Sequence, residues 1–218
     1  MLKAVIFDMD GTLVDSERVS ALAWRDTMDR MNASVDAAQG MFRSFIGRTA
    51  ASVTAELAEF LGGEDRAKEA FRIHAQMFDE LSEDLLELKP AARESIAQLR
   101  EAGLRIALAT STARPQALAR LSRFDLQDAF DVITTGDEIE NGKPAPDIFL
   151  KAAERLGVEP ASCAVIEDSF NGVRAGHASG AHVFMVPDLV PPTPEITALC
   201  DAVLSSLEEL APAVSAVR

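Results

Sequence analysis

The sequence predicts an α/β fold: a doubly wound, Rossmann-like parallel sheet with an inserted all-helical domain. Two observations carry this prediction. Short runs of apolar, often β-branched residues recur along the chain, and in its second half they alternate with helical patterns. Between the first two runs, residues 17–84 show helical periodicity and no convincing strand pattern. Alternating strands and helices are typical of a doubly wound sheet, and a separate helical stretch indicates an insertion.

The expected strands are uniformly apolar rather than alternating, which is typical of strands buried on both faces of a parallel sheet. They lie at residues 4–7, 104–109, 132–135, 164–166 and 182–186. The helical patterns between the later strands end on Gly103, Gly157 and Gly180. Glycine commonly follows the last residue of a helix, so these positions mark helix ends. Helices placed in this way imply right-handed crossovers between parallel strands.

The helical stretch after the first strand is too long to be a simple crossover. Its segments "SALAWRDTMDRM", "AASVTAELAEFLG" and "AKEAFRIHAQMFDELSE" all have apolar residues at helical spacing. We therefore expect a helical cap domain over residues 16–85 and a core domain formed by residues 1–15 and 86–218. The hinges between them are expected near residues 14–17 and 85–89.

Composition and charge exclude several classes of protein. The 218 residues are 48% hydrophobic and 26% charged, which is ordinary for a globular protein and sufficient for a sizeable core. A net charge of −14 disfavours nucleic acid and anionic membranes as partners. The N-terminal apolar stretch is too short for a signal peptide, and no run approaches the roughly 18 apolar residues of a membrane span. Cys163 and Cys200 have no metal-binding spacing. We expect a cytoplasmic monomer.

Polar side chains follow four of the expected strands. They are Asp8 and Asp10 after the first, Thr110 and Ser111 after the second, Lys143 in the loop after the third, and Glu167 and Asp168 after the fourth. In doubly wound sheets, ligands bind at the carboxyl ends of the strands. Mg²⁺ prefers oxygen ligands, while hydroxyl groups, loop amides and a lysine suit phosphate oxygens. The combination predicts a magnesium-dependent phosphoryl site.

Each of these residues has a simpler explanation when it is considered alone. Asp-Gly pairs are common in turns, Thr110 and Ser111 could cap a strand end, and Lys143 could be a solvated loop residue. Glu167 and Asp168 could cap the helix expected near residue 171. A calcium-binding EF-hand loop that starts at Asp8 is excluded, because its sixth and twelfth positions lack the required Gly and Glu. The ordered combination is more specific than any single member.

The segments "DMDGT", "ATS", "GKPAPDIF" and "VIEDSFNG" resemble the four motifs of the haloacid dehalogenase (HAD) superfamily. The helical insertion after the first motif resembles the β-phosphoglucomutase-like and phosphoglycolate-phosphatase-like branch. The resemblance extends from Val5 to about Asp188. It implies a Mg²⁺-dependent enzyme that acts on a small phosphorylated metabolite rather than a phosphoprotein, because a cap excludes bulky partners. Among such metabolites a sugar phosphate fits best, and phosphoglycolate or another phosphorylated acid is the alternative.

The resemblance implies a role for each acidic motif residue. Asp8 is the nucleophile that becomes an aspartyl-phosphate, and Asp10 is the general acid that later activates water. Mg²⁺ is held by the Asp8 carboxylate, the Asp10 backbone carbonyl and Asp168. Glu167 binds the metal through water or lies beside its ligands. To act as an acid, Asp10 has to carry a proton.

The resemblance also implies the residues that bind the phosphate. Thr110 and the amide of Ser111 bind its oxygens, and Gly11 belongs to the same phosphate-binding loops. Lys143 pairs with Asp8 and with the phosphoryl group. A third carboxylate, Asp15, follows the first motif at the expected hinge, where we expect it to have a structural role.

Asp10 and Ser20 help to choose among the reactions that the family catalyses. True dehalogenases lack the second aspartate of the first motif, so Asp10 favours phosphoryl chemistry. β-Phosphoglucomutases usually carry a cap histidine at the position of Ser20, so its absence favours a phosphatase over the alternative of a phosphosugar mutase. A catalytically idle binding or scaffold member of the family is the remaining alternative. It is disfavoured because every motif residue is present.

The cap is expected to select the substrate. "FIGRTAASV" resembles a substrate-contacting segment of the mutases and makes Arg48 the leading candidate contact, with a solvated helix-start arginine as the alternative. Arg72 falls where mutases often have a cap lysine. His74 and Trp24 are expected to be packing or surface residues rather than ligands.

Overall fold

A six-stranded parallel sheet forms the centre of the computed structural model, which describes residues 1–36, 42, 45 and 50–217. The strand order is β3-β2-β1-β4-β5-β6, and every pairing is parallel. The strands are β1 (Ala4–Phe7), β2 (Arg105–Thr110), β3 (Val132–Thr135), β4 (Cys163–Glu167), β5 (His182–Met185) and β6 (Ala202–Val203). This sheet confirms the predicted fold class. Only β6 lacked a prediction, because two residues are too few to form a recognisable pattern.

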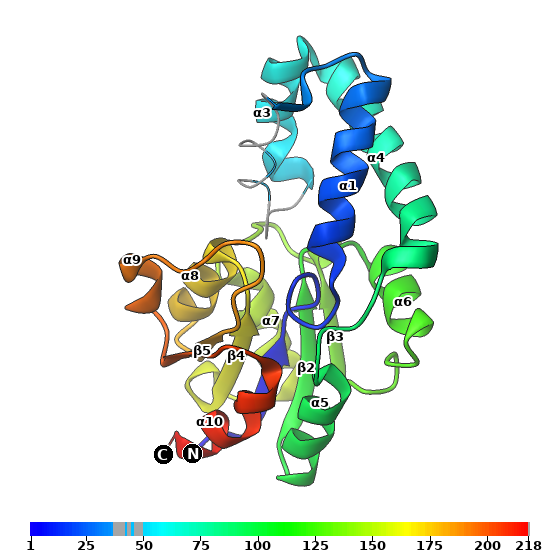
Figure 1. The fold of residues 1–218 in the computed structure, drawn as a ribbon. Helices are drawn as coiled ribbons and strands as arrows, with labels where there is room; N and C mark the ends of the chain where they lie inside the picture. The colour runs from blue at the N-terminus through cyan, green and yellow to red at the C-terminus, as the bar shows by residue number, and fades with distance from the viewer. Residues whose placement is uncertain (37–41, 43–44, 46–49, 218) are drawn as a thin grey trace.

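Helices cover both faces of the sheet (Figure 1). One face is covered by α5 (Ala92–Glu101), α6 (Arg114–Arg123) and α10 (Leu210–Ala216), and the other by α7 (Asp147–Leu156) and α8 (Phe170–Ala178). In β1, Val5 and Phe7 pack in the first apolar cluster, whereas Ala4 and Ile6 pack in the second. Successive strand side chains point to opposite faces, so a strand covered on both sides must be apolar throughout.

The remaining long helices stand together beyond the carboxyl end of the sheet (Figure 1). They are α1 (Ser16–Arg30), α3 (Ala50–Leu61) and α4 (Glu64–Leu85). They share an apolar cluster that includes Trp24, Met28 and Leu57. In α4, the buried residues Ala70, Ile73 and Met77 recur at helical spacing on one side. An insertion with its own apolar cluster agrees with the predicted helical cap.

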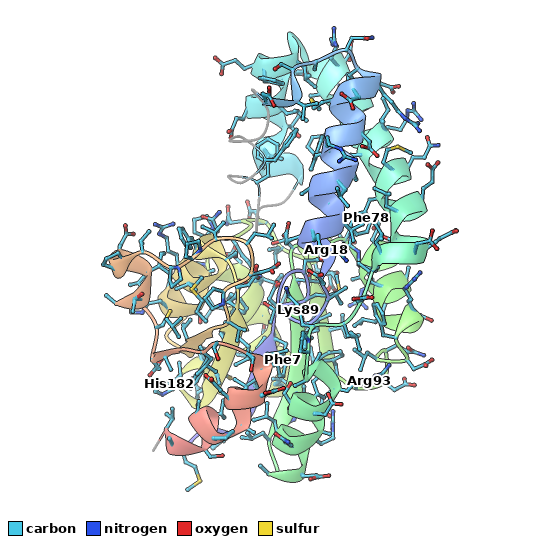
Figure 2. All side chains as sticks on the ribbon, viewed as in Figure 1. Phe7, Arg18, Phe78, Lys89, Arg93 and His182 are labelled. Carbon is cyan, nitrogen blue, oxygen red and sulfur yellow. The ribbon has the colours of Figure 1, made fainter. Side chains whose placement is uncertain are left out.

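Two chain segments connect the helical part to the sheet and run side by side. Val14 forms an antiparallel bridge with Leu88. Lys89 lies at this crossing (Figure 2), where its Nζ is 3.4 Å from Asp15 Oδ1 and 2.5 Å from Asp188 Oδ1. Asp15 is thus an ion-pair partner where the two segments meet, and its structural role at a hinge remains a prediction.

The strand order places the carboxyl ends of β1, β2 and β4 side by side. The chain leaves β1 toward β2 on one side and later returns to β4 on the other side. This reversal is a topological switch point, where open α/β sheets bind ligands. Asp8 directly follows β1, Thr110 ends β2, and Glu167 ends β4. Three of the predicted site segments therefore meet at one position.

The apolar contact between α7 and the sheet provides a test of the fold. Phe149 is 1% exposed and packs against the sheet, whereas its neighbour Leu150 is 41% exposed. We expect Phe149→Ala to lower the free energy of unfolding by about 3–5 kcal/mol, and Leu150→Ala to change it by about 0.5 kcal/mol or less. Urea denaturation measures both. Equal losses would contradict the assigned packing.

Candidate active site

A buried lysine joins the ends of β1 and β4. Lys143 Nζ lies 2.5 Å from Asp8 Oδ1 and also donates to Glu167 Oε1. These side chains are almost fully buried, with exposures of 2% for Lys143, 5% for Asp8 and 0% for Glu167. Burial acts to lower the pKa of Lys143, but the two carboxylates raise it above its ordinary value. The lysine is therefore a fixed positive charge between two acidic groups.

Glu167 stabilises the loop that follows β4 by accepting hydrogen bonds from it. Its Oε2 accepts hydrogen bonds from the backbone N–H groups of Asp168 (3.1 Å) and Ser169 (3.0 Å) and from Ser169 Oγ (2.9 Å). Ser169, rather than Glu167 or Asp168, is the N-cap of α8 and accepts from the Gly172 N–H. A Cβ at Gly172 would overlap the Glu167 carboxylate, so glycine permits this close approach.

The loop after β1 is fitted closely against Asp168. Thr12 Oγ1 donates to Asp168 Oδ1 at 3.1 Å. Gly11 has a φ of +83°, and a Cβ at this position would overlap the Asp168 carboxylate. Glycine is favoured here by the backbone conformation as well as by the lack of space. Its predicted contact with phosphate remains a prediction.

The buried acidic cluster fits a divalent cation. Asp8, Glu167 and Asp168 each offer an oxygen, and these atoms lie within 4.8 Å of one another. Burial raises the pKa of Asp8 and of Asp168 well above the ordinary value; Lys143 opposes this at Asp8, and repulsion among the carboxylates adds to it. Three carboxylates against one ammonium group leave excess negative charge in a buried place. Mg²⁺ prefers such oxygen ligands and would neutralise this charge.

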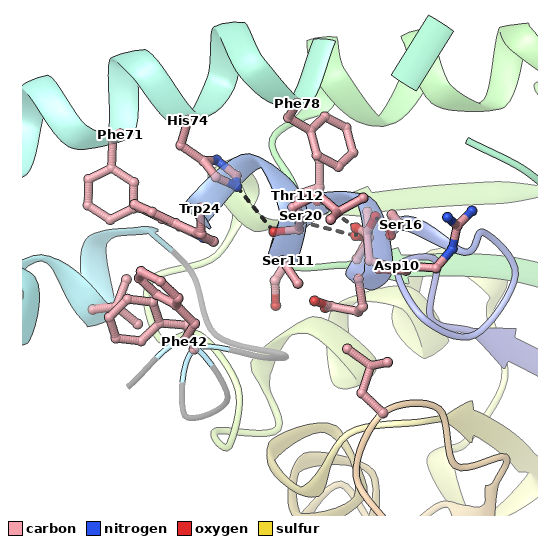
Figure 3. A pocket seen from close by; sticks show the side chains of 18 of the residues that line it. Asp10, Ser16, Ser20, Trp24, Phe42, Phe71, His74, Phe78, Ser111 and Thr112 are labelled. Atoms are coloured by element: carbon pink, nitrogen blue, oxygen red, sulfur yellow. Dashed lines mark hydrogen bonds between the residues drawn. The ribbon is translucent and has the colours of Figure 1, made fainter. Parts of the chain in front are cut away.

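Asp10 faces a different set of partners (Figure 3). Its Oδ1 accepts from Ser16 Oγ (2.7 Å) and pairs with Arg120, while its Oδ2 accepts from the hydroxyls of Thr112 (2.6 Å) and Thr110 (3.3 Å). Burial acts to raise the pKa of Asp10, but Arg120 and these hydroxyls bring it below its ordinary value. Asp10 is therefore a charged carboxylate in this conformation, whereas its expected role as an acid requires a proton.

Arg120, Thr112 and Ser16 are site residues that the sequence did not reveal. Arg120 lies on α6, which no recognised motif includes, and its guanidinium carbon is 4.4 Å from the ring centroid of Phe78 on α4. Arg120 thus touches both the catalytic aspartate candidate and the helical part. Thr112 directly follows the recognised "ATS" segment, so its position beside Thr110 and Ser111 was the only available signal.

A cavity of about 850 Å³ lies between the sheet edge and the helical part. Of the predicted site residues, Asp8, Asp10, Thr110 and Ser111 line it. The other predicted core residues are buried near Asp8; they are Gly11, Lys143, Glu167 and Asp168. The structure thus brings the core motifs together at one end of this cavity.

The residues considered as cap contacts differ in their location relative to the cavity. Arg72 does not line the cavity. Its exposed side chain pairs with Glu69 at 2.7 Å, and its position in the sequence alone could not reveal this direction of the side chain. Trp24 packs in the helical cluster as expected, but both Trp24 and His74 also line the cavity. Arg48 lies outside the described residues.

A substitution of Lys143 tests its pairing with the two carboxylates. We expect Lys143→Met to lower the free energy of unfolding by about 3–5 kcal/mol, because it leaves buried charges without a partner. Urea denaturation without added metal measures this loss. Lys68→Met removes a side chain that is 68% exposed and pairs with Asp65, and should cost about 1 kcal/mol or less. Similar losses in both variants would contradict the assigned role of Lys143.

Glu17 on α1 lines the cavity close to other acids. Burial, followed by repulsion from Asp10 and Asp188, raises the pKa of Glu17 from 4.5 to about 8. As the pH rises through this window, the unfolded chain loses the Glu17 proton before the folded chain does. The free energy of unfolding contributed by this group therefore falls with rising pH.

We expect Glu17→Gln to remove this pH-dependent loss. The stability of the variant relative to wild type should therefore increase from pH 4.5 to pH 8 in metal-free buffer. Urea denaturation at a series of pH values measures the difference. Parallel stability profiles for the two proteins would show that Glu17 is not perturbed in this way.

Sequence and structure comparisons place the chain among known enzymes. The sequence model of the haloacid dehalogenase-like hydrolases matches residues 2–180. A Thermotoga maritima protein named phosphorylated carbohydrates phosphatase is 36% identical over 182 residues, which cover 82% of each chain. Hexitol phosphatase B of Escherichia coli K12 is 32% identical over 208 residues, which cover 95% of this chain and 93% of the relative.

A solved structure agrees with these sequence matches. CbbY from Rhodobacter sphaeroides in complex with phosphate aligns with a TM-score of 0.81 and 28% identity, covering 96% of both chains. Within the described part of the chain, no helix is both long and apolar enough to cross a membrane. The sheet, the meeting of the four motifs and these matches lead to one conclusion: the chain belongs to the haloacid dehalogenase-like hydrolase family, as an enzyme of the phosphatase type.

Proposed function

We propose that this protein is a Mg²⁺-dependent phosphatase that hydrolyses a small phosphorylated metabolite of the carbohydrate class. The observation that carries the proposal is Asp8, a carboxylate on the cavity wall that is paired with buried Lys143 and adjoins Asp168. The names of the relatives, a phosphatase of phosphorylated carbohydrates and a hexitol phosphatase, support the substrate class.

Asp8 is the proposed nucleophile. One of its carboxylate oxygens attacks phosphorus, the bond from phosphorus to the leaving oxygen breaks, and an aspartyl-phosphate forms. A phosphate dianion repels a bare carboxylate, so Lys143 offsets part of the negative charge in the transition state. Mg²⁺, held by Asp8, Asp168, the Asp10 carbonyl and indirectly Glu167, would supply further charge neutralisation when bound.

Asp10 is the proposed general acid and base. It gives a proton to the leaving oxygen and later removes one from the water that cleaves the aspartyl-phosphate; such proton transfers contribute about 10²–10⁴-fold. In the structure its oxygens are occupied by Arg120 and neighbouring hydroxyls. Proton donation therefore requires Asp10 to turn away from Arg120. Arg120 also contacts Phe78 on α4, so a change at Asp10 that releases Arg120 would alter a contact with the helical part.

Thr110 and Ser111 are the proposed phosphate-binding residues, together with the loop at Gly11. Both side-chain positions line the cavity beside Asp8. The Ser111 backbone also lies close against Gly136, where a Cβ would overlap the Ser111 carbonyl. This close packing fixes the loop after β2, so its amide can hold a phosphate oxygen in a constant position.

Asp8→Asn tests the assignment of the nucleophile. With p-nitrophenyl phosphate and Mg²⁺ we expect kcat to fall by about 10³-fold or more, because the amide cannot form the covalent intermediate. Chelation by EDTA should abolish wild-type turnover, and added Mg²⁺ should restore it. Asp128→Asn, at an exposed position, is the matched control and should retain activity.

Wild-type activity in Asp8→Asn would refute the nucleophile assignment, and turnover in EDTA would refute the metal dependence. Complete inactivity of wild-type protein on all phosphate esters would favour the catalytically idle alternative.

One observation favours the mutase alternative. Ser20 Oγ lies 3.2 Å from His74 Nε2, so α4 supplies an imidazole beside the position where mutases usually carry their cap histidine. Incubation with β-glucose 1-phosphate separates the two reactions. A phosphatase releases inorganic phosphate, whereas mainly glucose 6-phosphate as product would establish the mutase reaction.

A further inference from the structure

We propose that the substrate's leaving group carries an aromatic or otherwise apolar ring that binds in the helical end of the cavity. On this view the enzyme acts on a phosphorylated sugar with a ring attached to it, in preference to a bare sugar phosphate. This inference rests on the proposed phosphatase function, which it narrows to a substrate class.

The two ends of the cavity differ in chemistry (Figure 3). The end formed by the sheet edge is polar and carries Asp8, Asp10, Thr110 and Arg120. The end formed by the helices carries aromatic and aliphatic side chains, among them Trp24, Phe42, Phe71 and Val53. A phosphate bound at the first end directs its leaving group toward the second.

The aromatic side chains form a continuous wall. The Trp24 ring is stacked between His74, at a centroid distance of 4.2 Å, and Phe42, at 5.0 Å, and Phe71 meets it edge-on at 5.5 Å. Phe71, Phe42 and His74 remain only partly buried, so each still offers surface to the cavity. Both faces of the indole are already covered. The surface left for a ligand is therefore apolar ring surface, which favours a ligand ring packed edge-to-face or offset.

Few polar groups among the described residues accompany this wall. Ser20 and His74 are bonded to each other, and the Arg25 guanidinium pairs with Asp26 at 3.0 Å. Against the described side chains of this wall, the hydroxyls of a large polyol would lose more water partners than they gain in new ones, which is unfavourable. The Ser20–His74 pair suits one hydroxyl or ring heteroatom. Apolar walls with a few placed polar groups are typical of sites for ring-containing ligands.

The uncharged state of His74 is compatible with binding of a neutral ligand ring. Burial lowers the pKa of His74 to about 4, with Ser20 opposing and Arg120 adding to the shift. At neutral pH the imidazole is uncharged, so it offers no cation to a second phosphate or a carboxylate. The volume of about 850 Å³ also lies well within the roughly 300–1,000 Å³ of cavities that enclose drug-sized ligands.

A matched pair of substrates tests the proposal. Ribose 5-phosphate and phenyl β-riboside 5-phosphate have the same phosphate ester and leaving oxygen, and the second adds an aromatic ring. We expect kcat/KM to be about tenfold or more higher for the phenyl riboside, because apolar pocket contacts discriminate by about this factor. Equal or lower kcat/KM for the phenyl riboside would overturn the inference.

A reference reaction separates this inference from the proposed function. Wild-type protein that hydrolyses p-nitrophenyl phosphate but shows no preference for the phenyl riboside retains the proposed function and refutes only the ring-binding inference. Wild-type protein that hydrolyses no phosphate ester refutes both.

Substitutions in the aromatic wall test the location of the ring. Phe71→Ala should lower kcat/KM for the phenyl riboside several-fold more than it lowers kcat/KM for ribose 5-phosphate, so the preference for the phenyl riboside falls. Phe60→Ala is the matched control, because Phe60 packs against the same cluster without lining the cavity. It should retain the full preference. If Phe71→Ala lowers Tm below the assay temperature, Phe71→Leu replaces it. A folded Phe71 variant with an unchanged preference would refute the assigned location.

Discussion

The site depends on one buried ion-pair arrangement, in which Lys143 lies between Asp8 and Glu167. A charge in the interior is costly unless it is paired, so both carboxylates depend on Lys143, and the buried lysine depends on its two acidic partners. The lysine comes from the loop after β3, and the carboxylates come from the ends of β1 and β4. The arrangement therefore fixes three separate segments of the chain relative to one another, and the positions of Asp168 and Gly11 follow from it.

Negative charge remains in excess after Lys143 is paired, and this excess is the reason to expect a bound cation at the site. Asp168 adds a further carboxylate within 4.8 Å of the other two, and burial prevents water from relieving their repulsion. The divalent cation proposed for this cluster would cancel that excess when bound, since its two positive charges match the net charge of three ionised carboxylates and one ammonium group. The charge of Asp10 is stabilised by other residues, because its carboxylate pairs with Arg120 and accepts hydrogen bonds from three hydroxyl groups.

The helical part adds contacts that the sheet cannot provide. Arg120 contacts both Asp10 and Phe78, so one side chain links the proposed proton-transfer group to the helical part. The aromatic wall around Trp24 serves as packing for the helices and at the same time as a boundary of the cavity. A single cluster thus stabilises the helical part and gives the cavity its apolar end.

The sequence by itself determined the sheet and the core motifs. Apolar runs such as residues 4–7 are local patterns, and the polar residues that follow them reach one edge because parallel strands share a direction. Only the tertiary structure decided the partners of Asp10, the exposure of Arg72 and the place of His74 in the cavity. These depend on how whole helices pack across long sequence separations. No local spacing encodes that packing, because the contacting residues follow no shared period.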